Sequence, residues 1–232
     1  MINENYEAVR GKIREACKRV GRNESEVTLI AVSKTKPMED ILEAYEAGAR
    51  DFGENKVQEL VKKYDEGKTP EAKWHMIGHL QRNKVKDVVG RAALIHSVDS
   101  FRLAEEINIQ GKKLGIKVPV LIEINAAGEE SKFGVSLEDA EELIKQISEN
   151  LSGISVKGLM TVAPYVVDSE ENREIFHKIK DLSVDIAAKN YDNVSMNILS
   201  MGMTGDYEVA IEEGATIVRV GTGIFGERNY MV

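Results

Sequence analysis

Residues 27–37 read VTLIAVSKTKP, an almost unbroken apolar run that ends abruptly in a polar segment with two lysines. A strand covered on both faces needs apolar side chains at consecutive positions, whereas a half-exposed strand alternates apolar with polar residues. The run therefore predicts a buried parallel strand, and the lysines mark its carboxyl end. Residues 118–124, VPVLIEI, have the same character.

Eight strand-like runs of this kind lie along the chain, and segments with helical spacing of apolar residues lie between them. The expected strands span 27–32, 50–53, 73–77, 94–98, 118–124, 155–160, 196–200 and 216–220. The expected helices span 37–47, 55–64, 100–114, 137–149, 169–189 and 206–213.

Alternating strands and helices suit both a closed barrel and an open doubly wound sheet, because the two share the same local pattern. Eight strand-then-helix units in a chain of 232 residues favour a single (β/α)8 TIM barrel. We therefore expect an α/β protein with one domain over residues 1–232.

An additional helix is predicted before the first strand. Apolar residues recur there at spacings of three and four, at Ile2, Tyr6, Val9, Ile13, Cys17 and Val20. Gly21 follows as a helix stop. Cys17 falls on the expected inner face, so core packing is its expected role. A single cysteine makes no internal disulfide, which fits a reducing compartment.

Composition narrows the classes of partner. The formal net charge of −8 argues against a nucleic-acid groove, because such grooves gather Lys and Arg to displace phosphate counterions. The chain has no signal-like start and no apolar run of membrane-spanning length. We expect a cytoplasmic protein without nucleic-acid or membrane partners. A monomer is expected, because no exposed apolar stripe stands out.

Two glycine-rich segments follow the last two expected strands, SMGMTG at 200–205 and GTGIFG at 221–226. In a (β/α)8 barrel, phosphate commonly binds between the loops after strands seven and eight. Glycines let backbone N–H groups approach an anion, Ser200 and Thr222 offer hydroxyls, and a helix beginning near 206 offers its positive end. We predict a phosphate cup here, with tight turns alone as the alternative.

Lys34 and Lys36 leave the first strand with the same parity, so spacing does not say which one faces the site. A partly desolvated lysine at a barrel mouth has the lowered pKa that Schiff-base chemistry needs. Two solvated surface lysines are the alternative. Arg219 lies between two valines of the eighth strand and needs a partner there, either Glu123 or a ligand atom.

Two other polar residues follow expected strands. Asn55 is open to two interpretations, a helix N-cap or a ligand contact, and His79 is either a ligand contact or an ordinary loop histidine. His75 and His79 stand four apart, but on a strand and its loop rather than on a helix, so no metal site is expected. Trp74 is expected to pack in the barrel.

Eight segments carry a resemblance that spans nearly the whole chain. In order they are AVSKTKP, FGENKVQE, WHMIGHLQRNK, HSVDS, GEESKFG, GLMTVAP, LSMGMTGDYEVAI and VRVGTGIFG. Together these segments resemble the pyridoxal phosphate homeostasis protein family, whose barrel is related to the N-terminal barrel of alanine racemase. The cofactor that this resemblance implies is pyridoxal 5′-phosphate.

The resemblance implies a role for each candidate residue. Lys34 would form the Schiff base, and Arg219 would face the pyridine nitrogen. The phosphate would be held by Ser200, the backbone of Gly202, Gly221 and Thr222. Asn55 and His79 would line the cofactor pocket. No residue is assigned to catalysis or to metal binding.

Three hypotheses for function follow. The first is a carrier that buffers pyridoxal phosphate for vitamin B6 homeostasis and hands it to apo-enzymes, with no robust catalytic activity. Arg219 beside the pyridine nitrogen would disfavour ring protonation and weaken the ring as an electron sink. The second is an amino acid racemase, but related racemases add a β domain and a partner tyrosine, and only six residues follow Gly226. Tyr165 or another pocket residue would have to replace that tyrosine as the second base. The third is a lysine-dependent aldolase acting on a sugar phosphate.

Overall fold

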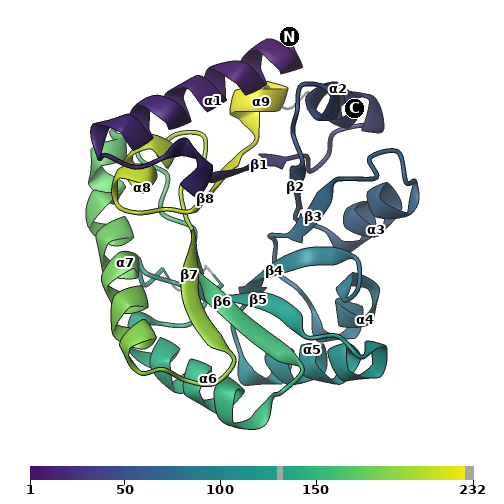
Figure 1. Cartoon of the computed structure of the whole chain (residues 1–232), viewed down its shortest axis with the longest axis vertical. Coiled ribbons are helices and arrows are strands. Elements are labelled where there is room, and N and C mark those ends of the chain that lie inside the picture. Colours follow the sequence, from purple (N-terminus) through teal and green to yellow (C-terminus); the bar gives the residue numbers. More distant parts are fainter. Residues whose placement is uncertain (130–132, 228–232) are drawn as a thin grey trace.

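The computed structural model describes residues 1–129 and 133–227, and within them eight parallel strands close into one barrel in the order β1 to β8 (Figure 1). The predicted (β/α)8 barrel is confirmed. Residues 130–132, which belong to the GEESKFG segment, and residues 228–232 lie outside the described part of the chain.

The observed strands match the expected ones to within about two residues at most ends. They are β1 (Thr28–Val32), β2 (Asp51–Glu54), β3 (Lys73–Met76), β4 (Ala92–Val98), β5 (Val118–Ile124), β6 (Ile154–Thr161), β7 (Val194–Ser200) and β8 (Ile217–Val220). Each strand pairs in parallel with both neighbours, and β8 returns to β1 to close the ring.

Helices surround the barrel. They are α1 (Ile2–Arg19), α2 (Met38–Glu46), α3 (Val57–Asp65), α4 (Val85–Val88), α5 (Phe101–Leu114), α6 (Leu137–Asn150), α7 (Arg173–Ala188), α8 (Tyr207–Glu212) and α9 (Thr222–Phe225), with 3-10 turns at Glu24–Glu26, Arg82–Lys84 and Ser169–Asn172. The sequence did not indicate α4 or α9, and the helix expected from 169 opens as a 3-10 turn. In the described ranges, none of these helices has the length and apolarity needed to cross a membrane.

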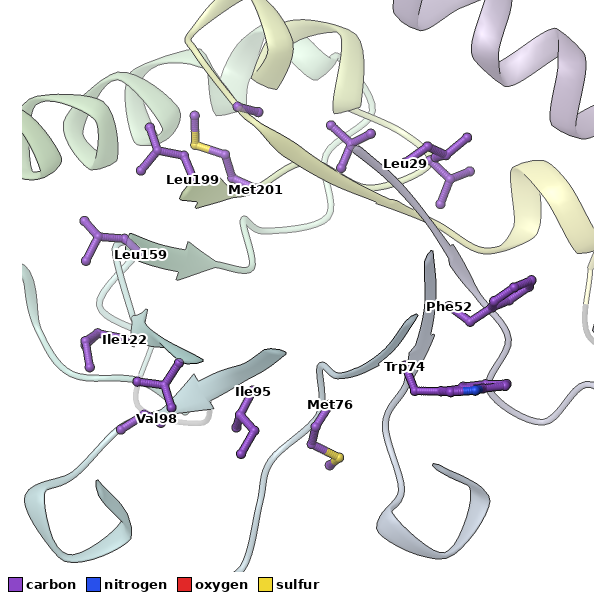
Figure 2. Close-up of a cluster of buried hydrophobic side chains, with 14 of the residues drawn as sticks. Leu29, Phe52, Trp74, Met76, Ile95, Val98, Ile122, Leu159, Leu199 and Met201 are labelled. Atoms are coloured by element: carbon purple, nitrogen blue, oxygen red, sulfur yellow. The ribbon is translucent and has the colours of Figure 1, made fainter. Parts of the chain in front are cut away.

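Apolar side chains pack on both faces of the closed sheet. Inside the barrel, buried residues from five strands form one cluster: Ile30, Val32, Leu94, Leu121, Met160 and Ile217. Outside it, a larger cluster fills the space between strands and helices, and Figure 2 shows its labelled side chains pointing away from the barrel centre. Trp74 belongs to this outer layer, 5.4 Å from Phe52 between ring centroids, so its expected packing role is confirmed.

The N-terminal helix α1 covers the side of the barrel where the described residues after β8 form the short α9. It packs against α2, α8 and α9 (Figure 1). Cys17 is buried in this contact, as expected. Val20 is not: the helix ends at Arg19, so Val20 is the C-cap residue and is 43% exposed. The side-chain amide of Asn5 donates a 3.0 Å hydrogen bond to the Ile224 carbonyl and so fastens α9 to α1.

Gly158 in β6 is required by a close approach between strands. Its φ is +154°, and a Cβ atom there would overlap the backbone carbonyl of Ile198 in β7. The register between β6 and β7 shifts just before this residue. Only glycine therefore fits the irregularity that keeps these two strands paired.

We predict that Gly158→Ala lowers the free energy of unfolding by about 2–3 kcal/mol, because the methyl group forces the strand pair apart. Gly11→Ala is the matched control. A Cβ at Gly11 in α1 meets nothing within 4 Å, so this change should stabilise the helix by about 0.5–1 kcal/mol. Urea unfolding followed by circular dichroism measures both. Equal effects of the two substitutions would contradict the prediction.

Candidate functional site

A cavity of about 500 Å³ opens at the carboxyl ends of the strands. Its wall is built from the ends of β1, β2, β3, β6, β7 and β8 and the segments that follow them. In a closed parallel barrel these ends form one ring, so residues distant in sequence meet there. Lys34, Lys36 and Arg219 line the cavity, and three cationic side chains favour an anionic ligand.

A buried ion pair anchors the turn that carries Lys34. The Nζ atom of Lys63, on α3, lies 2.7 Å from Oε1 of Glu54 and donates a 2.8 Å hydrogen bond to the Ser33 carbonyl. The Ser33 hydroxyl donates to the same Glu54 oxygen at 2.6 Å. Removing either charge would leave the other buried without its partner. The pair therefore holds the residue that precedes Lys34.

Thr35, which follows Lys34, takes a φ of +64°, which is unusual for a β-branched residue. Its N–H donates a 2.7 Å hydrogen bond to the Glu59 carboxylate, which compensates for the strained backbone. Lys36 has a structural contact as well, because its Nζ atom donates to the Phe225 carbonyl at 2.8 Å. This contact links the β1 turn to α9.

Arg219 projects from β8 into the barrel, where it is almost fully buried and lines the cavity. Its Nη1 atom donates to the Ser200 hydroxyl at 2.6 Å, and Nη2 donates to the Thr161 carbonyl at 2.8 Å. Burial lowers the pKa of Arg219 to about 10, so the guanidinium stays charged at neutral pH. Arg219 thus finds its partners in two polar groups, one on the adjacent strand β7 and one on β6.

Glu123, the other partner considered for Arg219, makes no ion pair with it in the described residues. The Glu123 Oε2 atom is buried without a hydrogen-bond partner. Burial first, and then the charge of the nearby Asp99, raise the pKa of the Glu123 carboxyl to about 7, although Arg219 opposes the shift. A carboxyl in this position is largely protonated below neutral pH.

The end of the cavity between β7 and β8 carries two hydroxyls. Thr204 follows β7 and Thr222 opens α9, and their Oγ1 atoms lie 3.2 Å apart with both residues lining the cavity. Gly205 and Gly221 also line the cavity beside them. The expected glycine-rich loop after β8 is instead the short helix α9, whose docking on α1 overrides its poor helix propensity.

The N-terminus of α8 was expected to offer its positive end to a phosphate, but a carboxylate of the protein already stands there. Asp206 stands at its N-terminus, where Oδ1 accepts from the Met203 N–H at 2.7 Å and Oδ2 from the Asn172 side chain at 2.8 Å. Asn172 also donates to the Pro164 carbonyl at 3.0 Å. These bonds brace the loop after β7 against the loop after β6.

Residues 5–229 match the family model of the alanine racemase N-terminal domain. The pyridoxal phosphate homeostasis protein of Aquifex aeolicus is 48% identical over 219 residues, which cover 94% of this chain and 95% of the relative. The chain belongs to the pyridoxal phosphate homeostasis protein family. The family's protein from Escherichia coli K12 is 41% identical and covers 99% of this chain and 97% of its own length. A solved structure of PipY from Synechococcus elongatus with PLP bound has a TM-score of 0.84 and 33% identity, covering 97% of this chain and 100% of PipY.

Family membership confirms the resemblance drawn from the eight sequence segments, and the structure gathers most of the residues that the resemblance singled out. Those that line the cavity are Lys34, Asn55, Arg219, Gly221 and Thr222. The interpretation of Asn55 as a helix cap is wrong, because α3 has Lys56 at its N-cap position and no side-chain cap bond.

His79, Ser200 and Gly202 do not line the cavity. The ring of His79 stacks on Phe133 with centroids 3.9 Å apart. The hydroxyl of Ser200 lies inside the barrel, between Arg219 and His96. Gly202 is buried with a φ of +90°, and its carbonyl accepts the Arg219 N–H at 3.0 Å. Gly202 is therefore needed for the turn after β7.

Sequence reasoning missed three residues at this site. Thr204 lies in the predicted phosphate segment, but the sequence analysis named Ser200 as the hydroxyl that binds phosphate there. Ser200 is still part of β7, and its side chain points to the inner face of that strand. Lys63 lies in a KKY segment of α3 that looks solvated. His96 had no spacing signal at all.

We predict that Glu123→Gln gains stability relative to the native protein as pH rises from 4.5 to 7. The unfolded carboxyl ionises near its usual pKa of 4.5, whereas the folded one keeps its proton up to about 7. The native protein therefore loses stability across this window, by about 3 kcal/mol, and the neutral glutamine does not. Urea unfolding across this pH range measures the difference, with Glu149→Gln at an exposed site as control. If the free energy of unfolding changes with pH in the same way for native protein and Glu123→Gln, the prediction is wrong.

Proposed function

We propose that this chain binds pyridoxal 5′-phosphate in the cavity, with covalent attachment at Lys34, and serves the intracellular homeostasis of this vitamin B6 form. The observation that carries the proposal is the meeting of Lys34, Arg219 and the Thr204–Thr222 hydroxyl pair around one cavity. PipY, solved with PLP bound, supports the assignment of the ligand.

The residues present fit the chemistry of this cofactor. Pyridoxal phosphate supplies an aldehyde that condenses with a lysine amine, with loss of water. Lys34 and Lys36 both line the cavity, and the family segments single out Lys34 as the reacting lysine. The threonine hydroxyls and the glycines beside them suit a phosphate group. Arg219 would meet the pyridine nitrogen.

A carrier fits this site better than a racemase. Racemisation needs a second base on the face of the ring opposite the lysine. Tyr165, the candidate substitute, is 96% exposed at the rim of the cavity, so it is not held in place for proton transfer. We propose reversible binding of pyridoxal phosphate and its release to apo-enzymes as partners, in the cytoplasm and by a monomer.

We predict that borohydride reduction with pyridoxal phosphate labels Lys34 and leaves Lys36 unlabelled in peptide mass spectrometry. Lys34→Ala and Lys34→Arg should both lose the label and the visible absorption band of the bound cofactor, because neither side chain has an amine that can condense. Lys36→Ala should keep both. Lys34→Arg retains the positive charge and so separates covalent attachment from charge attraction.

The opposite result would identify another function. If native protein gains no band and no label with pyridoxal phosphate, the proposal fails. Labelling of Lys34 by borohydride with a phosphorylated keto-sugar would then point to a lysine-dependent aldolase. Rapid exchange of an amino acid α-proton with solvent, catalysed by the loaded protein, would instead favour a racemase.

We predict that Thr204→Val and Thr222→Val each weaken pyridoxal phosphate binding by roughly tenfold, because each removes a hydrogen bond to a charged group. Binding of pyridoxal, which lacks the phosphate, should change less than about twofold. Thr28→Val, at the other end of β1, is the matched control and should alter neither affinity. Equal losses for the two ligands would show that the hydroxyls do not hold the phosphate.

A further inference from the structure

A chain of buried polar groups crosses the interior of the barrel and ends at Arg219. Its members come from β8, β7, β4, β3 and β2, and we call it the Arg219 relay: Arg219, Ser200, His96, His75 and Asp51. The successive distances are 2.6 Å from Arg219 Nη1 to Ser200 Oγ, 3.0 Å from Ser200 Oγ to His96 Nδ1, 3.0 Å from His96 Nε2 to His75 Nδ1, and 3.0 Å from His75 Nε2 to Asp51 Oδ1.

The hydrogens of the relay have one arrangement in which every group between its ends both donates and accepts. Arg219 can only donate, so the Ser200 oxygen accepts from it and sends its own proton to Nδ1 of His96. His96 then carries its proton on Nε2 and donates to Nδ1 of His75. His75 in turn carries its proton on Nε2 and donates to Asp51. All four hydrogen bonds point the same way, from a cation to an anion.

Burial supports neutral imidazole in the middle of the relay. His96 and Ser200 have no exposed surface, and His75 is 4% exposed. Burial first, and then the charges of His75 and Arg219, lower the pKa of His96 well below its usual value. Hydrogen bonds that all run in one direction polarise one another, so each strengthens the next.

The only member of the relay with substantial solvent exposure is Asp51, the first residue of β2, whose side chain is 19% exposed. Its carboxylate is the acceptor at the end of the relay. The charges of Glu123 and Asp206 also act on Arg219, although neither residue belongs to the relay. The relay therefore couples the orientation of Arg219 to a carboxylate on β2, which it reaches by way of β7, β4 and β3, although Arg219 and Asp51 both pair with Ile30 of the intervening β1.

We propose that the Arg219 relay fixes the direction of the guanidinium toward the cofactor's ring, with Asp51, His75, His96 and Ser200 as positioning residues. The proposal rests on the proposed function, since the ring of pyridoxal phosphate is the object that Arg219 meets. It also gives Ser200 a role other than contact with the phosphate.

The arrangement of protons is tested first on the protein without cofactor, by nitrogen-15 NMR of the histidine side chains. We expect both His75 and His96 to be neutral with the proton on Nε2. A His96 proton on Nδ1 with a doubly protonated His75 is the opposite arrangement and would overturn the relay. In Asp51→Ala the signals of His96 should move, although the two side chains are not in contact, whereas Asp51→Asn keeps an acceptor and should preserve them.

Cofactor binding is tested next with Asp51→Ala and Ser200→Ala. Each should weaken pyridoxal phosphate binding by roughly tenfold, the equivalent of about one hydrogen bond, and shift the absorption band of the bound cofactor. Ser183→Ala removes another buried serine hydroxyl, on α7, and should leave affinity and band unchanged. Asp51 lies at a strand start, so its variants test the relay even if Ser200→Ala fails to fold.

The outcomes separate the two proposals. If native protein binds pyridoxal phosphate and both alanine variants behave like Ser183→Ala, the positioning role is overturned while the proposed function stands. If native protein does not bind pyridoxal phosphate, the proposed function fails, and the positioning role fails with it, whatever the histidine signals show.

Discussion

Closure of the parallel sheet is the constraint on which the rest of the molecule depends. Each of the eight strands pairs with two neighbours, so no edge is left open, and parallel direction puts every carboxyl end in one ring. A cavity lined from six strands is possible only because of that ring. The close approach of β6 and β7 at Gly158 is one of the places where closure dictates a residue.

The second constraint is burial of charge. The inside of the barrel and the layer beneath its helices hold little water, so each charged group buried there needs polar partners. Lys63 pairs with one oxygen of Glu54 while holding the Lys34 turn, and the other Glu54 oxygen is buried without a partner. Arg219 is satisfied by a serine hydroxyl and a backbone carbonyl. One oxygen of Glu123 also lacks a partner, and burial raises the pKa of this carboxyl.

The N-terminal helix contributes to the site without reaching it. It packs on α8 and α9, the two elements that follow the strands bordering the hydroxyl end of the cavity. The bond from Asn5 to Ile224 and the bond from Lys36 to Phe225 hold α9 between α1 and the Lys34 turn. Because the described helix after β8 is only one turn long, α1 covers this side of the barrel.

The sequence by itself determined the strand and helix order, the position of Lys34 at a strand end and the region of the two glycine-rich segments. These depend on local periodicity and on turn residues, which neighbouring positions reveal. Strand parity left Lys34 and Lys36 as equal candidates for the reacting lysine, and the family segments singled out Lys34. The failure to predict α9 also has a local cause, because its glycines lower the helix propensity of that segment.

Only the tertiary structure decided which side chains meet inside the barrel. His75 and His96 have no sequence pattern that pairs them, and Ser200 serves Arg219 because both turn inward from adjacent strands. Lys63 is buried because Glu54 lies beneath α3, not because of its neighbours in sequence. Such contacts follow from the stagger and tilt of strands in a closed barrel, which no single segment encodes.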